Sequence, residues 1–337
     1  MPAVKLLALL GAAAVGWLAV TVVHRRTRGH PGGRAFFDHA PARWGFMLLA
    51  VTTSLAVAAP LVAPYSPTVQ LDIVGLQNRP PSLTHLLGTD LYSRDVWSRL
   101  LYGARVSLAV GALSMLVAIV VGTAVGATAG YRRGAVDAIL MRFVDVGLSV
   151  PRIFILLVLA GLWDQMPLSA LIIGIGLTSW FGTSRLVRAE VLSVREREFV
   201  HAARALGAGP ARVVLQHILP NAAGPIIVTA ALVTGAVMLL ESGLSFLGIG
   251  VAPPLPSWGN MIADAKDHMR AAPWSVLAPG LAIGLVVTAC AAVGDGLRAA
   301  LDPRRSGRRA RLARGQASLD LSAPMSPRSP AGPRSHS

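Results

Sequence analysis

Two ionisable side chains stand inside long apolar stretches, where they have the most potential for chemistry. Arg152 directly follows Pro151 in one stretch, and Glu241 lies within another. Because an ionisable group is costly in apolar surroundings, it usually faces a cavity or an opposite charge. Arg152 could attract the carboxylate of a substrate, or it could extend to a polar surface or pair with Asp145 or Glu241. Glu241 could line a substrate pathway, or it could serve as a hydrogen-bonding group in the packing.

The sequence contains no recognisable motif for nucleotide hydrolysis, metal binding or nucleophilic catalysis. A phosphate-binding loop needs glycines before its lysine and a Ser or Thr after it, and neither Lys5 nor Lys266 has them. The histidines are scattered, and the single cysteine, Cys290, lies in an apolar stretch. The sequence therefore predicts no catalytic residue, no metal site and no cofactor bound by this chain.

The composition describes an apolar yet basic chain. Of its 337 residues, 53% are hydrophobic and only 14% are charged, yet the formal net charge is +15. Soluble domains carry about a quarter charged residues, and disordered chains are far less apolar. A nucleic-acid-binding protein would explain the charge but not the apolar content. An all-α, multi-pass membrane protein with its positive charge on one side of the bilayer explains both.

Six apolar runs approach the length of about 20 residues that a helix needs to cross a bilayer. They are approximately Trp44–Pro64, Val106–Ala129, Val146–Trp163, Pro167–Thr183, Gly224–Ile249 and Val276–Gly294. Pro151 should kink the third. A seventh run, Leu6–Val23, is either a cleaved signal peptide or an additional membrane helix. We favour the helix, because Lys5 is the only charge before the run and no clear small-residue cleavage site follows it.

The arginines predict how these helices are oriented. Most of the 31 lysines and arginines fall in the linker between the opening run and residue 44, at 132–133, in a loop over 185–222 and in a tail over 304–337. Because positive charge concentrates on the cytoplasmic side, these segments and the C-terminus should be cytoplasmic. The membrane domain then occupies 44–303, after a hydrophobic segment and basic linker over 1–43. The tail should be disordered, since it is rich in Arg, Ser, Pro and Gly.

The loop over 185–222 has the pattern of a helix, a break and a second helix. Its apolar positions are Leu192, Phe199 and Leu206 on the first piece, and Val213, Val214 and Ile218 on the second. The break falls between Gly207 and Pro210, and Pro220-Asn221 should end the second piece before the next membrane helix. The small residues around Gly207 would let another protein approach closely. The alternative is an ordinary amphipathic helix at the membrane surface.

Five segments of the sequence form an ordered set of motifs. Residues 202–220 read AARALGAGPARVVLQHILP, and residues 86–108 read LLGTDLYSRDVWSRLLYGARVSL. The other three are MRFVDVGLSVP at 141–151, ESGLSFLGIGVAPPLPSWGNMI at 241–262 and GDGLRAALDPR at 294–304. The first resembles the EAA loop, and the second the GTD-x-x-GRD segment, of C-type permease subunits in ABC importers of dipeptides, oligopeptides or nickel. All five together resemble this subunit over roughly residues 44–304.

The resemblance implies two functional regions. One is a site in the loop that couples to partner ATPases, made of His201, Ala202, Ala203, Gly207, Ala208, Leu219 and Pro220. The other is an outer cap, which could be a folded cover alone or a docking surface for a substrate-binding protein. Its residues are Gly88, Thr89, Asp90, Arg94, Asp95, Pro256, Ser257, Trp258 and Gly259. Two residues depart from the family pattern: His201 replaces the usual glutamate, and Ser93 replaces a glycine, which argues against a positive φ there.

The resemblance implies a non-enzymatic permease with a six-helix, type I ABC importer core and, here, an extra N-terminal helix. It would form half of a pathway for di- or oligopeptides, nickel chelates or similar small solutes. Its partners would be a second homologous permease, two ATPase subunits that bind ATP and Mg, an extracytoplasmic binding protein and the lipid of a bacterial inner membrane, but no nucleic acid. One alternative is an ion-gradient-driven transporter or channel, but the sequence shows none of the internal repeats that such transporters often have. The other is an intramembrane enzyme, but the sequence shows no paired catalytic groups.

Overall fold

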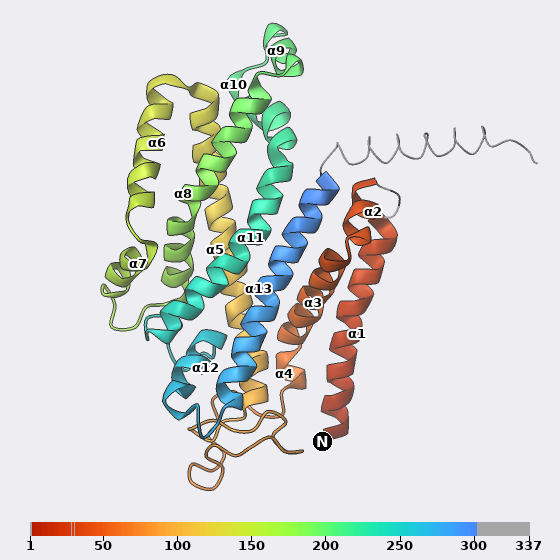
Figure 1. Ribbon diagram of the computed structural model, residues 1–337, viewed down its shortest axis with the longest axis vertical. Coiled ribbons are helices and arrows are strands. Elements are labelled where there is room, and N and C mark those ends of the chain that lie inside the picture. The colour runs from red at the N-terminus through yellow and green to blue at the C-terminus, as the bar shows by residue number, and fades with distance from the viewer. Residues whose placement is uncertain (1, 28, 30, 302–337) are drawn as a thin grey trace, which may run out of the picture. The chain divides into compact units, whose positions relative to one another are not determined.

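The computed structural model describes residues 2–27, 29 and 31–301, and the predicted tail over 304–337 lies outside them. Residues 1–300 form one compact unit built from helices (Figure 1), which confirms the all-α prediction. The helices are α1 (Pro2–Thr27), α2 (Pro31–Asp38), α3 (Ala40–Val57), α4 (Ala59–Val62), α5 (Val96–Arg132), α6 (Gly134–Ser149), α7 (Arg152–Ala160), α8 (Leu168–Arg195), α9 (Glu198–Ala205), α10 (Pro210–Arg212), a π-helix (Val213–Ile218), α11 (Leu219–Phe246), α12 (Trp258–Ala265), a 3₁₀ turn (Lys266–His268) and α13 (Trp274–Leu301).

Five helical segments in the described part of the chain are long and apolar enough to cross a membrane. They are α3, α5, α8, the segment from α10 through α11, and α13, and the bent pair α6–α7 makes a sixth if it is counted as one span. Each of the six predicted runs falls on one of these segments. The helices extend beyond the runs, because α5 and α8 continue into polar sequence at their ends.

Proline interrupts two of the predicted runs. α6 ends at Ser149 and α7 begins at Arg152, and the two helices meet at 81° around Pro151, which confirms the predicted kink. Proline disfavours helical backbone in the residue before it and removes one backbone N–H donor. In the first run, α3 ends at Val57 and α4 starts just before Pro60 for the same reason.

α5 and α8 pack closely because small residues line their contact. Three glycines of α5, at positions 122, 126 and 130, face α8 at one-turn spacing. A Cβ added at Gly130 would lie 2.9 Å from the carbonyl oxygen of Arg188, so a larger residue would push the helices apart. Small residues at such spacing let helix backbones approach in lipid, where apolar burial does not drive association.

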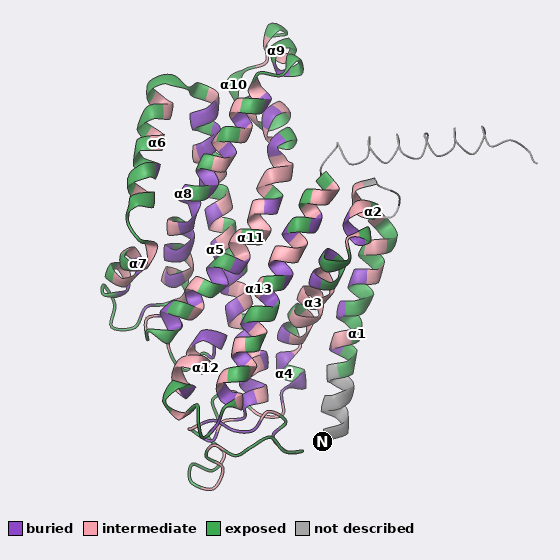
Figure 2. Cartoon of the chain, viewed as in Figure 1, coloured by how far each residue is buried: buried purple, intermediate pink, exposed green. Residues whose placement is uncertain are grey.

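α8 is the most enclosed of the candidate spans, and the others expose apolar surface. Of its apolar window 61% is buried, against 17–28% for α3, α5, α10–α11 and α13, as Figure 2 also shows. The exposed side chains include Leu113, Leu116, Val120, Leu281 and Leu285. Lipid or further protein subunits must cover these faces, because water would not favour them.

α1 is a continuous helix that packs along α3. An added Cβ at Gly16 would lie 2.9 Å from the backbone Cα of Val51, so the two helices are in close contact there. Ala12 and Val20 of α1 are buried, and Phe36 and Phe37 of α2 complete a core with Ala42 of α3. The predicted apolar run Leu6–Val23 therefore lies inside one helix, which packs as part of the compact unit.

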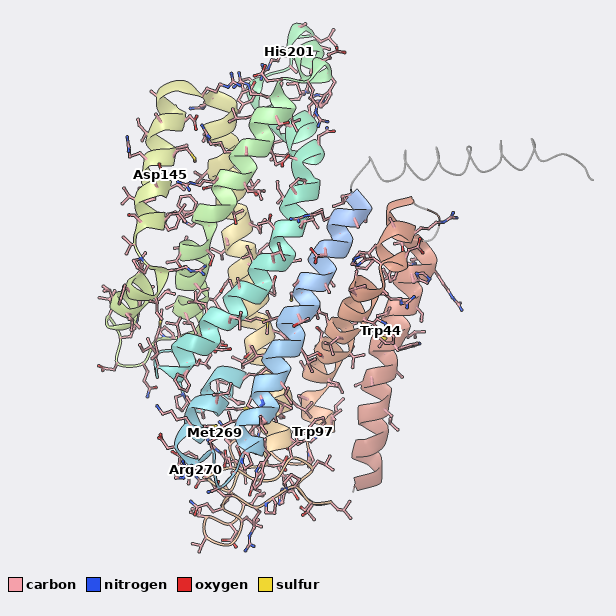
Figure 3. The ribbon with its side chains drawn as sticks, in the orientation of Figure 1. Trp44, Trp97, Asp145, His201, Met269 and Arg270 are labelled. Carbon is pink, nitrogen blue, oxygen red and sulfur yellow. The ribbon has the colours of Figure 1, made fainter. Side chains whose placement is uncertain are left out.

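The polar segments gather at the two ends of the helices. α9 lies at one end, where His201 is labelled, and Met269 and Arg270 lie at the other end (Figure 3). The long connection between α4 and α5 lies at the same end as α12 (Figure 1). We refer to these as the α9 end and the α12 end.

Candidate functional site

At the α9 end, α9 is held to the rest of the molecule by a single buried side chain of its own. Val200 is fully buried against Val191 and Val194 of α8 and against Val213 and Ile218 of the π-helix. On the same helix, the guanidinium of Arg204 lies 5.1 Å from the ring centre of Tyr131 in α5. α9 therefore contacts α5, α8 and the π-helix that leads into α11.

The predicted apolar stripe over this segment is wrong. Leu206 is 89% exposed and Phe199 is 39% exposed, while Leu192 belongs to a different helix. The chain leaves helical geometry at Glu196 and Arg197, so the periodicity of α8 does not continue into α9. This break turns Val200 inward and leaves Phe199 and Leu206 on the outer surface.

Gly207 ends α9 in a left-handed conformation, with φ of +81°. Its N–H donates to the carbonyl of Arg204, and the N–H of Ala208 donates to the carbonyl of Ala203, each at 3.0 Å. This pair of bonds is the Schellman motif, which favours glycine at the left-handed position. A Cβ there would meet no atom within 4 Å, so the need for glycine comes from the backbone and not from lack of space.

His201 and Ala202 are exposed on α9, and Ala203 and Ala208 are partly buried beneath them. The ring Nε2 of His201 lies 3.9 Å from a carboxyl oxygen of Glu196, which also pairs with Arg133 at 2.8 Å. An acidic group therefore stands beside the position where the family usually has glutamate, although His201 itself is basic.

The prediction that Pro220 and Asn221 end the second piece is wrong, because the helix continues to Phe246. The π-helix before Pro220 explains why the proline is tolerated. Proline lacks the N–H that would bond the carbonyl four residues earlier, while the N–H of Leu219 donates to Val214, five residues back. The side chain of Asn221 donates to the carbonyl of His217 at 2.8 Å. Leu219 and Pro220 are thus the first two residues of α11, and the π-helix before them connects α11 to the segment that contains α9.

At the α12 end, two acidic and two basic residues form a closed network. One oxygen of Asp90 accepts from Arg94 at 2.7 Å and from Arg99 at 2.6 Å. One oxygen of Asp264 accepts from Arg94 at 2.8 Å and from Arg99 at 2.9 Å. Because Asp90 and Arg94 belong to the loop, Arg99 to α5 and Asp264 to α12, the network joins three segments.

The outer-cap residues before α5 form one hydrogen-bonded turn. Asp95 caps α5: one carboxyl oxygen accepts from the N–H and hydroxyl of Ser98, and the other lies 2.9 Å from the ring Nδ1 of His85. Thr89 pairs with Asp95 in a β-bridge. Gly88 has φ of +70°, and a Cβ on it would lie 2.7 Å from the indole nitrogen of Trp274.

Ser93 corrects the sequence-based expectation that no positive φ is needed at its position. Its φ is +57°, and the residue is completely buried. Its hydroxyl has no hydrogen-bond partner among the described residues. The turn thus demands left-handed backbone there, and serine adopts it at a steric cost that glycine would avoid.

Glu241 lies beneath α12 and not beside Arg152. One of its carboxyl oxygens accepts from the hydroxyl of Ser245 at 2.7 Å and from that of Ser257 at 2.9 Å, and the residue is fully buried. Ser257 is the N-cap of α12 and forms a capping box with Asn260. Glu241 therefore bonds in the packing, which was one of its two sequence-based interpretations, and it ties α11 to the outer cap.

The remaining outer-cap residues surround this bond. The backbone N–H of Trp258 donates to Ser107 at 3.1 Å, and its indole donates to the carbonyl of Leu100 at 3.0 Å. Gly259 lies against the backbone of Ser242, where a Cβ would be 2.7 Å from its Cα. Pro256 precedes the cap of α12 and is buried. The predicted cap residues thus form two groups, one in the turn before α5 and one at the start of α12, which the arginine network connects.

Arg152 makes neither of the ion pairs predicted for it. Its guanidinium donates to the hydroxyl of Ser179 on α8 at 3.1 Å. Asp145 pairs with Arg185 instead, and Glu241 bonds serines. The 81° bend after α6 points the two helices apart, so helical spacing does not carry Arg152 to Asp145.

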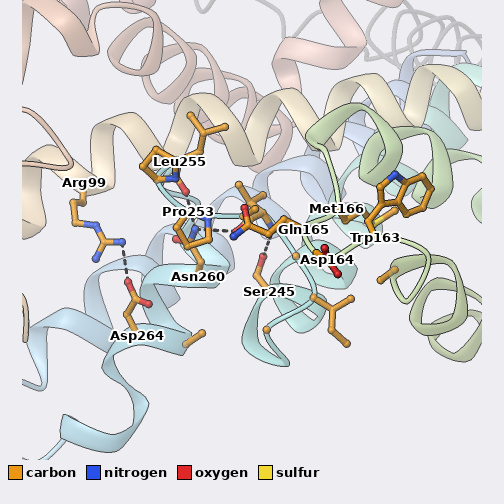
Figure 4. Close-up of a pocket in the computed structure, with 18 of the residues that line it drawn as sticks. Arg99, Trp163, Asp164, Gln165, Met166, Ser245, Pro253, Leu255, Asn260 and Asp264 are labelled. Atoms are coloured by element: carbon orange, nitrogen blue, oxygen red, sulfur yellow. Dashed lines mark hydrogen bonds and ion pairs between the residues drawn. The ribbon is translucent and has the colours of Figure 1, made fainter.

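A cavity of about 840 Å³ opens between the outer cap and the connection from α7 to α8 (Figure 4). Arg94, Arg99 and Asp264 line one side, and Trp163, Asp164 and Gln165 line another. Neither Arg152 nor Glu241 lines it. Sequence reasoning missed Arg99 and Asp264, although Arg99 follows Asp95 by four residues as Arg94 follows Asp90. Nothing in a single sequence signals Asp264, which is 165 residues from Arg99.

Comparison with known proteins identifies the family. Residues 122–307 match the family described as binding-protein-dependent transport system inner membrane component. The chain belongs to this family.

Its relatives are similar along most of their length. A Brucella suis protein named as a peptide permease is 40% identical over 276 residues, which cover 80% of this chain and 89% of that protein. The dipeptide transport system permease protein DppC of Alkalihalophilus pseudofirmus is 40% identical over 261 residues, which cover 77% and 84%. A Brucella abortus protein named as a peptide transport system permease is 39% identical over 272 residues, which cover 80% and 90%.

Membership settles the class of protein. This permease is a multi-pass component of the inner membrane in a binding-protein-dependent ABC importer, as the resemblance of its motifs implied. Such permeases are not enzymes and carry no cofactor, because ATP is bound by partner ATPases. The partners of the permease therefore include an ATPase and a substrate-binding protein.

Proposed function

We propose that this permease forms half of the translocation pathway of a peptide importer, opposite a second homologous subunit, with two ATPase subunits bound at the α9 end. The relatives named above are peptide or dipeptide permeases, which supports di- or oligopeptides as the substrate class. The exposed apolar faces of α5 and α13 suit a second membrane subunit as well as lipid.

The observation that carries the proposal is the outward placement of Leu206, the residue that caps the end of α9. This residue is 89% exposed next to the Gly207 turn, while Val200 anchors the same helix from below. An exposed leucine beside a fixed turn suits insertion into an apolar groove of another protein, because burial there removes its apolar surface from water. We infer that His201, Ala202, Ala203, Gly207 and Ala208 form the ATPase contact around it.

The connections of α9 supply a mechanism. When ATP closes the ATPase pair, α9 moves together with the ATPase groove that holds it. Val200 and Arg204 transmit this displacement to α8 and α5. Leu219 and Pro220 transmit it to α11. ATP can favour one conformer of the permease only through contacts that differ between conformers. The α9 contact is the one through which this difference enters the membrane helices.

The orientation follows from charge. The α9 end carries the arginines of the 185–222 loop together with Arg132 and Arg133, so we place it in the cytoplasm, with the C-terminus on the same side. The α12 end then faces the binding protein, and the outer cap and its cavity form the docking surface. α1 begins at the α12 end (Figure 1), and its packing on α3 supports its retention as a membrane helix.

The test compares two exposed leucines at opposite ends of the permease. Leu206→Asp should weaken association with the ATPases at least tenfold, because it places a charge in an apolar contact, and ATP-driven dipeptide uptake should fall with it. Leu83→Asp is the control for ATPase association, since Leu83 is 99% exposed in the loop before α5, at the end opposite the proposed ATPase contact. The measurements are co-purification of the ATPases and dipeptide uptake by the reconstituted importer. Full association and uptake with Leu206→Asp would refute the proposed contact.

A further inference from the structure

A small cavity lies between α1, α2 and α3 near the α9 end, away from the outer cap and the ATPase contact. Its volume is about 290 Å³, and its lining includes Trp17 and Val20 of α1, Phe37 of α2, and Arg43 and Trp44 of α3. The two indoles are 54% and 57% exposed, so both present apolar surface to the surroundings of the helices. Trp side chains at such positions are typical of the boundary between lipid tails and headgroups.

The lining changes from basic to apolar along the helix axes. Arg43 lies in the first turn of α3, and His24 lies in the last turn of α1, so both stand at the charged end of the cavity. Trp17 lies about 10 Å further along α1 than His24, and Met47 lies about 6 Å further along α3 than Arg43, at 1.5 Å per residue. A ligand that matched this cavity would carry a polar, anionic end and an apolar body.

Basic residues outnumber acidic ones in the segment around the cavity. Residues 24–43 contain five arginines and a single acidic residue, Asp38. Arg25, Arg26, Arg34 and Arg43 are exposed, and the guanidinium of Arg43 lies 6.0 Å from the ring centre of Trp44. Basic pockets between membrane helices attract lipid headgroups of negative charge, at about 1 kcal/mol for each basic residue near the surface.

We propose that this cavity is a binding site for an anionic phospholipid. The phosphate lies at Arg43, and the first part of the acyl chains lies along Trp17, Val20 and Met47. Gly16 brings α1 close to α3, so the site exists only while α1 is packed there. The occupant links α1 and α2 to the membrane domain from the lipid side. The proposal does not depend on the substrate or on the ATPase contact.

The test uses quenching of tryptophan fluorescence by brominated lipids. The purified full-length permease is placed in vesicles with increasing fractions of brominated phosphatidylglycerol or, separately, brominated phosphatidylcholine. We expect phosphatidylglycerol to quench at about fivefold lower mole fraction, which corresponds to the ~1 kcal/mol of one basic contact. Trp17→Phe with Trp44→Phe should remove this preferential component. Equal quenching of the wild-type protein by the two lipids would overturn the proposal without any variant.

A matched pair of arginine variants locates the charge. Arg43→Gln should abolish most of the preference for phosphatidylglycerol, because it removes the cation at the polar end of the cavity. Arg142→Gln removes an exposed arginine from α6, on the opposite side of the molecule in Figure 1, and should leave the preference unchanged. An equal loss in both variants would mean that only the overall charge attracts the lipid, and it would refute the site.

Discussion

At the scale of single residues, two left-handed backbone positions limit what the side chain can be. Gly207 and Ser93 both have positive φ, yet one is open to solvent and the other is buried. At Gly207 the conformation ends α9 and presents Leu206, so its consequence is functional if the proposed ATPase contact forms there. At Ser93 it shapes the turn before α5, so its consequence is stability. Each position therefore predicts a different measurable effect of substitution.

Gly207→Ala should uncouple ATP hydrolysis from transport while the protein still inserts. The left-handed conformation costs an L-residue about 1–2 kcal/mol, so the alanine variant shifts the end of α9 and moves Leu206. Gly209→Ala is the matched control, because Gly209 has φ of −66° and equal free space. The measurement is dipeptides transported per ATP hydrolysed in proteoliposomes. Equal ratios in the two variants would contradict a special requirement at Gly207.

Ser93→Gly should stabilise the permease by about 1 kcal/mol. The substitution relieves left-handed strain and removes a buried hydroxyl that has no partner among the described residues, and these gains outweigh the added flexibility of glycine in the unfolded chain. Ser93→Ala removes the hydroxyl but keeps the strain, so it should stabilise less. Thermal unfolding in detergent ranks the three proteins, and a midpoint for glycine below that for serine would disprove the strain argument.

At the scale of elements, the sequence predicts spans well and connections poorly. All six apolar runs fall on candidate spans, because twenty consecutive apolar residues are a strong local signal. The stripe in the 185–222 loop is wrong because one break at Glu196 resets the helical phase of everything after it. The continuation past Pro220 is missed for a related reason: a π-helix is a register change that leaves no periodic mark in the residues.

In the candidate site, the sequence identifies several of the residues but not the long-range pairs that they form. The family motifs select Asp90, Arg94 and Ser257, whose partners in the structure are partly local. The pairing of Ser257 with Glu241, and of Arg99 with Asp264, arises when α11 and α12 fold over α5. Such contacts depend on tertiary packing, so spacing along the chain cannot reveal them.

Pro220→Ala should reduce transport although ATPase binding is kept. Alanine restores the missing N–H, so the π-helix can become α-helical. Because each residue of an α-helix turns the chain by about 100°, this change of register rotates α9 relative to α11 by about that angle. Pro225→Ala, inside α11 but beyond the π-helix, restores an N–H without this rotation and is the control. We expect slower hydrogen exchange over 213–220 together with lower dipeptide uptake in the first variant alone. Normal uptake with slowed exchange would show that the π-helix is not needed for coupling.

At the scale of the whole molecule, the two ends are built on different principles. At the α9 end, α9 has a single buried side chain, Val200, and the segment leaves His201, Ala202 and Leu206 exposed, which suits a part that moves with a partner. The α12 end relies on buried polar bonds that join the loop before α5, α5 itself, α11 and α12. In the orientation proposed above, this difference would let a binding protein dock on the outer cap while the α9 end changes conformation.

The rigidity of the outer cap depends on Asp264, and Asp264→Asn tests it. Loss of the carboxylate leaves Arg94 and Arg99 sharing Asp90 alone, so the free energy of unfolding should fall by ~1–3 kcal/mol, less than for a fully enclosed pair because the Asp264 side chain is 33% exposed. Asp267→Asn removes the same charge from an exposed residue one turn further on and should leave stability unchanged. Thermal unfolding of the two variants in detergent measures the difference. Because the network is partly buried, 1 M salt should reduce the difference only slightly, whereas a difference that salt abolishes would indicate a surface charge effect instead of a structural network.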